Sequence, residues 1–192
     1  MNLALFDFDG TLIEKDSLGE FIKYAVGEKR YIVGMIKFSP FFIAYKLKLM
    51  KNYVAKEILF REFFRDYDEQ KFKTIANEFS LNELDKYIKK DIYAKFLKHI
   101  EDGDRVVIVS ASMRCWLEAW SKKHNVELLS TQLEFIDGKF SGRFLTKNCH
   151  GIEKVNRIKE HLSLDDYENI YAYGDSSGDD EMLALANYAF RV

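Results

Sequence analysis

Apolar residues are spaced in two different ways along this chain. Short continuous apolar runs, each bounded by glycine or polar residues, are typical of buried strands. Four such runs lie at residues 3–8, 106–109, 169–173 and 188–192. Between them, residues 113–124 and 152–161 carry apolar side chains at helical spacing. Strands that alternate with helices predict an α/β fold with a doubly wound parallel sheet.

The stretch from Leu18 to about Ile100 interrupts this alternation. Its apolar residues recur three and four positions apart, as in residues 54–64 and 72–79, and it contains no convincing strand. We therefore expect a helical cap inserted into the α/β core. The expected boundaries are residues 1–14 and 91–192 for the core and 15–90 for the cap.

Two local signals add detail to this organisation. Pro40 is the only proline, and it predicts a break between two cap helices because proline removes a helix hydrogen bond. Residues 135–144 alternate apolar and polar positions around Asp137 and Gly138. This alternation predicts a β-hairpin with an Asp-Gly turn.

Composition excludes several classes of protein. With 47% hydrophobic residues, the 192-residue chain can bury a sizeable core, which excludes a disordered or low-complexity protein. Its 29 basic and 31 acidic residues give a net charge of −2, so we expect no nucleic-acid partner. Cys115 and Cys149 are too few for a disulfide framework, and the first residues contain no basic leader. We therefore expect a cytoplasmic protein.

The charge is unevenly distributed along the chain. Lys23 to Lys56 holds eight basic residues, one acidic residue and several aromatic residues, so it sums to +7 and the remainder to −9. A basic segment with aromatic residues is typical of peripheral contact with a membrane, here the inner membrane surface. The alternative is that the aromatic residues form the core of the cap and the lysines its solvated face.

Acidic side chains follow the first expected strand. Asp7 and Asp9 are two positions apart, so both point to the same side of a strand, and like charges this close need a cation. Carboxylate oxygens suit Mg²⁺. Alone, the sequence Asp-x-Asp-Gly is also compatible with a simple polar turn.

Three later segments add polar groups at comparable places. Ser110 ends a strand and Ser112 begins a helix, where the hydroxyls and backbone N–H groups bind an anion or the serines act as N-caps. Lys154 lies in a first helical turn, where it either meets a phosphate or carboxylate or is a solvated surface lysine. Asp175 and Asp179 follow another strand, where they complete a metal site or favour a helix N-terminus.

Together, the motifs FDFDGT, a strand ending in serine, a lysine and GDSSGDD resemble, in this order, the haloacid dehalogenase superfamily of phosphohydrolases. The helical insertion after the first motif is similar to subgroup IB, which includes phosphoserine phosphatases. The segments NCHGIEKVNRIKEHL and AYGDSSGDDEML look closer still to its phosphatidylglycerophosphatase C-like branch. The resemblance implies a Rossmann-like core and a magnesium-dependent phosphatase.

The resemblance also implies a role for each matching residue. Asp7 matches the nucleophile that forms an aspartyl-phosphate, and Asp9 matches the general acid and base. Mg²⁺ would bind the Asp7 carboxylate, the Asp9 backbone carbonyl and Asp175, with support from Asp179. Ser110 and Lys154 would be catalytic by holding the phosphoryl oxygens. The residues implied in substrate binding are Thr11, Asp16, Ser110, Ala111, Ser112, Lys154 and Gly178.

The sequence departs from phosphoserine phosphatases in two places. The serine motif continues with alanine and serine where those enzymes usually carry glycines, and Gly178 replaces an asparagine. We therefore expect a different small organophosphate as the substrate. The alternatives are a phospholipid head-group phosphate at a membrane surface, and a phosphotransferase or phosphomutase reaction. Arg61 and Arg65 are candidates to bind an anionic part of the substrate.

Overall fold

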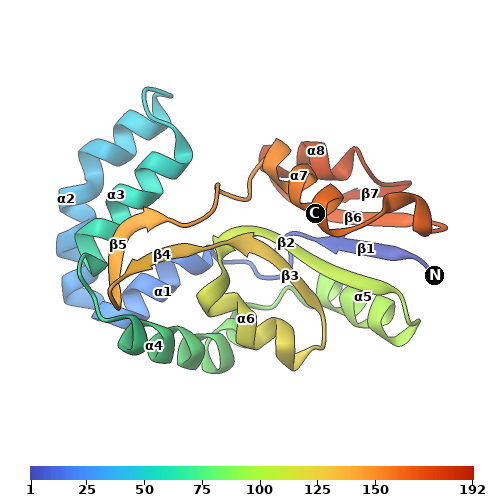
Figure 1. Ribbon diagram of the computed structural model, residues 1–192, viewed down its shortest axis with the longest axis horizontal. Coiled ribbons are helices and arrows are strands. Elements are labelled where there is room, and N and C mark those ends of the chain that lie inside the picture. Colours follow the sequence, from blue (N-terminus) through green and yellow to red (C-terminus); the bar gives the residue numbers. More distant parts are fainter.

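The computed structural model describes all 192 residues, and its central feature is a five-stranded sheet (Figure 1). The strands are β1 (Leu3–Phe6), β2 (Arg105–Met113), β3 (Glu127–Thr131), β6 (Ile170–Gly174) and β7 (Tyr188–Arg191). Their order is β3-β2-β1-β6-β7, and every neighbouring pair is parallel. The predicted α/β class with a parallel sheet is confirmed.

Helices cover both faces of this sheet. They are α5 (Lys90–Glu101), α6 (Arg114–Lys123), α7 (Ile152–His161) and α8 (Asp180–Leu183). Successive side chains of a strand point to opposite faces. On β1, Ala4 and Phe6 therefore join the hydrophobic core of α5 and α6, whereas Leu3 and Leu5 pack with α7 and α8. Figure 1 shows these two pairs of helices on opposite sides of the strands.

Four helices between β1 and α5 form the cap. They are α1 (Ser17–Val26), α2 (Glu28–Lys46), α3 (Asn52–Phe64) and α4 (Glu69–Asn82). Phe21 of α1 contacts Phe64 and Phe72 and stacks on Trp116 of α6, with 4.6 Å between the ring centroids. The cap therefore shares one continuous hydrophobic core with the α6 side of the sheet.

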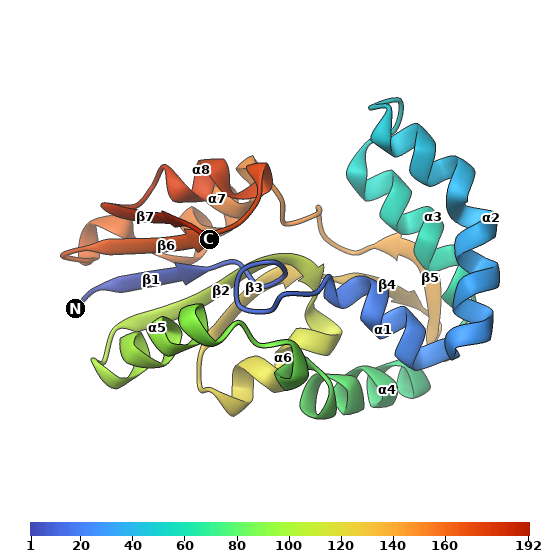
Figure 2. The same ribbon diagram turned by 180° about the vertical axis from the view of Figure 1, so that it is seen from behind.

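The predicted hairpin is formed by β4 (Leu133–Ile136) and β5 (Lys139–Phe144). Asp137 and Gly138 have φ values of 49° and 73°, as in the type I′ turn that Asp-Gly favours. The hairpin leaves the sheet and lies along α3, where the backbone N–H of Phe144 donates to Glu57 (Figure 2). The hairpin, which is distant in sequence from the cap helices, thus packs against one side of the cap.

Pro40 lies inside α2, so the predicted helix break at this residue is wrong. Proline has no N–H to donate to the carbonyl oxygen of Ile36, one turn earlier. The hydroxyl of Ser39 donates to that oxygen instead, at 2.7 Å. This replacement bond allows the helix to continue through the proline.

Two further features differ from the sequence-based expectation. The sequence of β3, ELLST, lacks the continuous apolar run that identified the other strands. Helix α6 begins at Arg114 because β2 continues through Met113.

Short 3-10 turns lie at Leu84–Tyr87, Leu164–Asp166 and Ser177–Asp179. None of the helices has both the length and the apolar character needed to cross a membrane.

Candidate active site

The carboxyl ends of β1, β2 and β6 meet the start of α7 at a polar pocket of about 320 Å³. Ligands of parallel sheets bind at this edge. The predicted site residues that line the pocket are Asp7, Asp9, Asp16, Ser110, Ala111, Lys154, Asp175 and Asp179. Thr11, Ser112 and Gly178 are buried next to it. The fold therefore brings all four sequence motifs to one place.

Lys154 lies at the centre of the site, with 2% of its surface exposed. Its ammonium group donates to Asp7 Oδ1 and Asp179 Oδ1, both at 2.6 Å, and to the carbonyl of Val109 at 2.7 Å. Burial alone would lower the pKa of Lys154, but the two carboxylates raise it well above its ordinary value. The alternative of a solvated surface lysine is therefore wrong.

Asp7 is held by two donors. Besides Lys154, the hydroxyl of Thr11 donates to Asp7 Oδ2 at 3.3 Å. Thr11 is fully buried, so it orients Asp7 from behind and does not line the pocket. Burial raises the pKa of Asp7 to about 6, against the opposing effect of Lys154.

Asp9 belongs to a separate hydrogen-bond network. Its carboxylate accepts from the backbone N–H of Ser17 at 3.2 Å, from the Ser17 hydroxyl at 3.1 Å and from the Ser112 hydroxyl. The indole of Trp116 donates to the Ser17 hydroxyl at 3.0 Å. Burial raises the pKa of Asp9 to about 7, and the nearby charge of Asp16 adds to the rise. Ser112 thus supports Asp9 and is not the N-cap of α6.

Asp7, Asp175 and Asp179 form an acidic cluster in which one oxygen of each lies within 4.8 Å of the others. A set of hard carboxylate oxygens fits Mg²⁺. Gly10 has a φ of 78°, and a Cβ at this position would lie 2.4 Å from Asp175 Oδ2, so glycine is required for the approach of Asp175. The Asp9 carboxylate lies outside the cluster.

Asp179 combines both interpretations of the last motif. Its Oδ1 accepts from Lys154, while its Oδ2 accepts from the backbone N–H and the hydroxyl of Ser176, each at 3.0 Å. Burial would raise the pKa of Asp179, but the charge of Lys154 holds it below its ordinary value. One carboxylate therefore closes a capping box and also belongs to the acidic cluster.

Ser110 and Ala111 line the pocket at the end of β2. The Ser110 hydroxyl accepts from the Ser112 N–H at 3.1 Å, so its own proton is available to a ligand. Gly178 is buried next to the pocket and does not line it. A Cβ on Gly178 would lie 2.5 Å from the imidazole of His150, which itself lines the pocket. Gly178 therefore makes room for His150.

The pocket also contains residues that the motifs do not include, notably Asn52 and Lys56 of α3. Lys56 Nζ donates to the carbonyl of Ala111 at 3.3 Å, between cap and core. Burial lowers the pKa of Lys56, although Asp16 opposes this effect. Asn52 and Lys56 could have been identified from the sequence, because they lie four positions apart and therefore share one face of a helix. That face is next to the buried residues Ala55 and Leu59.

Arg61 and Arg65, the candidates to bind an anionic part of the substrate, do not line this pocket. The aliphatic part of Arg61 lies beside Gly142 of the hairpin. Arg65 is exposed and pairs with Asp66 at 3.7 Å. The basic residues of the predicted cap that do line the pocket are Lys56 and, at the start of the cap, Lys15.

Known proteins resemble the chain over most of its length. The family model of haloacid dehalogenase-like hydrolases matches residues 4–184. Protein CicA of Caulobacter vibrioides is 32% identical over 187 residues, which covers 96% of this chain and 83% of CicA. The fold is similar to that of a protein of unknown function from Bordetella pertussis, with a TM-score of 0.78 and 22% identity over 96% of this chain and 86% of that chain. A structure described as a phospho-aspartyl intermediate analogue of phosphoserine phosphatase gives a TM-score of 0.59 and 19% identity over 96% and 83% of the two chains.

Proposed function

Because the chain belongs to the haloacid dehalogenase-like hydrolases, we propose that it is a magnesium-dependent phosphomonoesterase that works through an aspartyl-phosphate on Asp7. The observation that carries this proposal is the position of Asp7. Its buried carboxylate is oriented by Lys154 and Thr11, shares the pocket with Asp9 and belongs to the acidic cluster. The phospho-aspartyl analogue seen in a phosphoserine phosphatase of the same fold supports the same chemistry.

The proposed reaction has two displacements at phosphorus. An oxygen of Asp7 attacks, the bond to the leaving oxygen breaks, and Asp9 donates a proton to that oxygen. Asp9 then takes a proton from water, which attacks the phosphoryl group and releases Asp7. Ser110 would donate its free hydroxyl proton to a phosphoryl oxygen, and Lys154 would do the same in exchange for one of its three present acceptors. Mg²⁺, when bound by Asp7, Asp175, Asp179 and the Asp9 carbonyl, would offset the negative charge of nucleophile and substrate.

Phosphate release from p-nitrophenyl phosphate tests this proposal. We expect turnover with Mg²⁺, loss of turnover in EDTA and loss of at least about 10³-fold in Asp7→Asn, because the amide is a poor nucleophile. Asp165→Asn is the matched control, since Asp165 is an exposed acid in a surface turn. Equal release by the two variants would refute the proposal.

A phospholipid head-group phosphate at a membrane surface is the second candidate substrate, and the exposure of α2 favours it. Of the 19 residues in α2, Gly34 and Phe38 alone are buried. The exposed apolar residues of α2 and the following turn are Ile32, Val33, Ile36, Phe41, Phe42, Ile43, Leu47 and Leu49. Such residues among lysines suit an anionic membrane surface, and they argue against the alternative that this segment forms only the core of the cap.

Vesicle sedimentation separates this candidate from the first. We expect binding to vesicles containing phosphatidylglycerol at low salt and weaker binding after Ile36→Asp or Leu49→Asp. Leu97→Asp is the control, because Leu97 is also an exposed apolar residue, at 42% against 66% for Ile36 and 79% for Leu49, but lies on α5 of the core. Absence of binding to anionic vesicles at low salt would remove the membrane candidate and leave the phosphatase proposal intact.

A further inference from the structure

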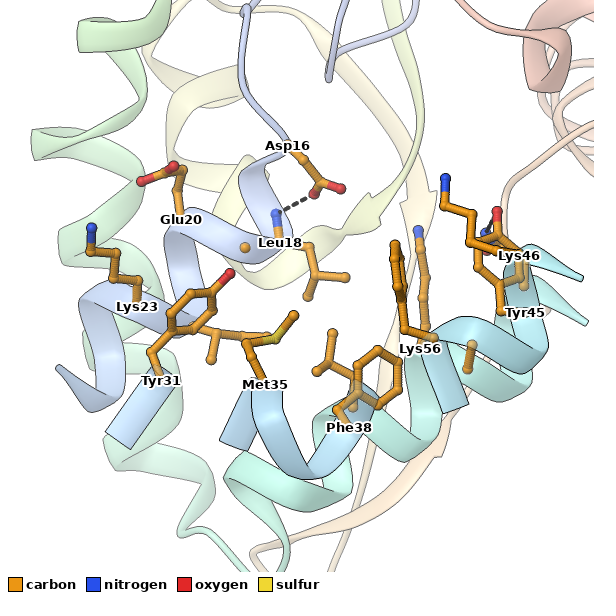
Figure 3. A pocket seen from close by; sticks show the side chains of 16 residues that line it. Asp16, Leu18, Glu20, Lys23, Tyr31, Met35, Phe38, Tyr45, Lys46 and Lys56 are labelled. Atoms are coloured by element: carbon orange, nitrogen blue, oxygen red, sulfur yellow. Dashed lines mark hydrogen bonds between the residues drawn. The ribbon is translucent and has the colours of Figure 1, made fainter. Parts of the chain in front are cut away.

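A second cavity, of about 630 Å³, lies within the cap between α1, α2 and α3 (Figure 3). Nine of its 16 lining residues are apolar or aromatic. Leu18, Met35 and Phe38 lie in the middle of the cavity wall, whereas Glu20 and Lys23 lie toward one side. The volume falls in the range of about 300–1,000 Å³ that is usual for small-molecule sites, whose walls are mostly apolar.

The cap cavity adjoins the catalytic pocket. Asp16, Asn52 and Lys56 line both, so the two spaces meet at the start of α1 and of α3. Lys56 reaches the carbonyl of Ala111 from this junction. A phosphate ester bound beside Asp7 therefore has a polar pocket around its phosphoryl group and an apolar space next to it, with a basic residue between the two.

We propose that the cap cavity receives an aliphatic part of the leaving alcohol, so that the preferred substrates are amphiphilic phosphate monoesters. This inference rests on the proposed phosphatase function and specifies its substrate class. Strongly hydrated alcohols would be disfavoured beside Leu18, Met35 and Phe38, because these apolar side chains offer no hydrogen bond in place of the lost water. The charged residues that also line the cavity are Asp16, Glu20, Lys23, Lys46 and Lys56. Each methylene that enters the cavity is expected to raise kcat/KM by up to about fourfold, until the cavity is full.

A series of n-alkyl phosphates, from methyl to decyl phosphate, tests the proposal. Each ester is assayed with Mg²⁺ below the concentration at which it aggregates, beside p-nitrophenyl phosphate. We expect kcat/KM to rise with chain length and then reach a plateau. A flat or falling series in a protein that hydrolyses p-nitrophenyl phosphate would overturn the cavity proposal alone. Failure to hydrolyse any ester would instead overturn the phosphatase function.

Variants that fill the cavity provide a second test. Ala55→Phe adds a ring to the cavity wall, and Met35→Trp does so at a half-buried position where folding is less at risk. We expect the ratio of kcat/KM for octyl and methyl phosphate to fall by about tenfold or more in both. Ala94→Phe on the exposed side of α5 is the matched control and should keep the wild-type ratio. Filled variants that keep this ratio would overturn the proposal.

Discussion

Lys154 of the core and Lys56 of the cap face the same pocket but are held in different ways. Lys154 has two carboxylates and a carbonyl within 2.7 Å, and its pKa is raised because the effect of these carboxylates exceeds that of burial. Lys56 makes one hydrogen bond, at 3.3 Å, and burial lowers its pKa. The core lysine therefore pairs directly with two carboxylates, whereas Lys56 makes no ion pair and meets only the more distant charges of Asp16, Asp9 and Asp7.

The largest effect is expected from removing the core lysine. Lys154→Met leaves Asp7 and Asp179 buried without their cation, which should cost about 3–5 kcal/mol of unfolding free energy and abolish phosphatase activity. Urea denaturation in EDTA, together with the p-nitrophenyl phosphate assay, measures both effects. Lys159→Met, on the exposed side of the same helix, is the control. A loss of stability below about 1 kcal/mol would contradict the internal charge balance of the core.

The next largest effect is the difference in lost unfolding free energy between a substitution on the inner side of the cap and one on its outer side. Phe21 is fully buried and packs on Trp116, so Phe21→Ala should cost about 3–5 kcal/mol. Ile36 is 66% exposed, and Ile36→Ala should change the unfolding free energy by no more than about 0.5 kcal/mol. Urea denaturation compares the two. Equal losses of unfolding free energy would contradict the exposure of Ile36 and show that another segment of the chain packs on the outer side of α2.

These differences explain which parts of the molecule could be predicted from the sequence. Strands β1, β2, β6 and β7 and helix α7 follow from local patterns, since continuous apolar runs and helical spacing can be recognised without knowledge of their surroundings. The surroundings of Lys154 are not local. Alone, it is indistinguishable from a surface lysine, and the order of the motifs placed it in the site because the ends of neighbouring strands converge.

The cap was harder to predict for the same physical reason. Lys56 reaches the site only because α3 is packed so that its first turn faces the end of β2, a contact between segments 55 residues apart. The prediction of a helix break at Pro40 rests on the general rule for proline. The helix continues because the hydroxyl of Ser39 donates to the carbonyl oxygen of Ile36. The short strand β3 is recognisable mainly through its pairing with β2.

Removing the cap lysine should separate activity from stability. Lys56→Met is expected to lower kcat/KM by about 10–100-fold, the usual worth of a hydrogen bond to a charged ligand, while the unfolding free energy changes by less than about 1 kcal/mol. The assay and urea denaturation are the same as for Lys154→Met. A loss of stability comparable to that of Lys154→Met would mean that the cap, like the core, depends on its buried charge.

The smallest effect concerns α2, which has the lowest share of buried residues among the four cap helices. Ser39→Ala should cost about 0.5–1 kcal/mol, because it removes the donor to the Ile36 oxygen. In a Pro40→Ala background the backbone N–H of residue 40 can bond that oxygen, so the same change should cost close to nothing. Urea denaturation of the four chains measures this coupling. Because the bond is exposed, water competes for the Ile36 oxygen and keeps the effect small. If Ser39→Ala cost the same free energy of unfolding in both backgrounds, water alone would satisfy this carbonyl.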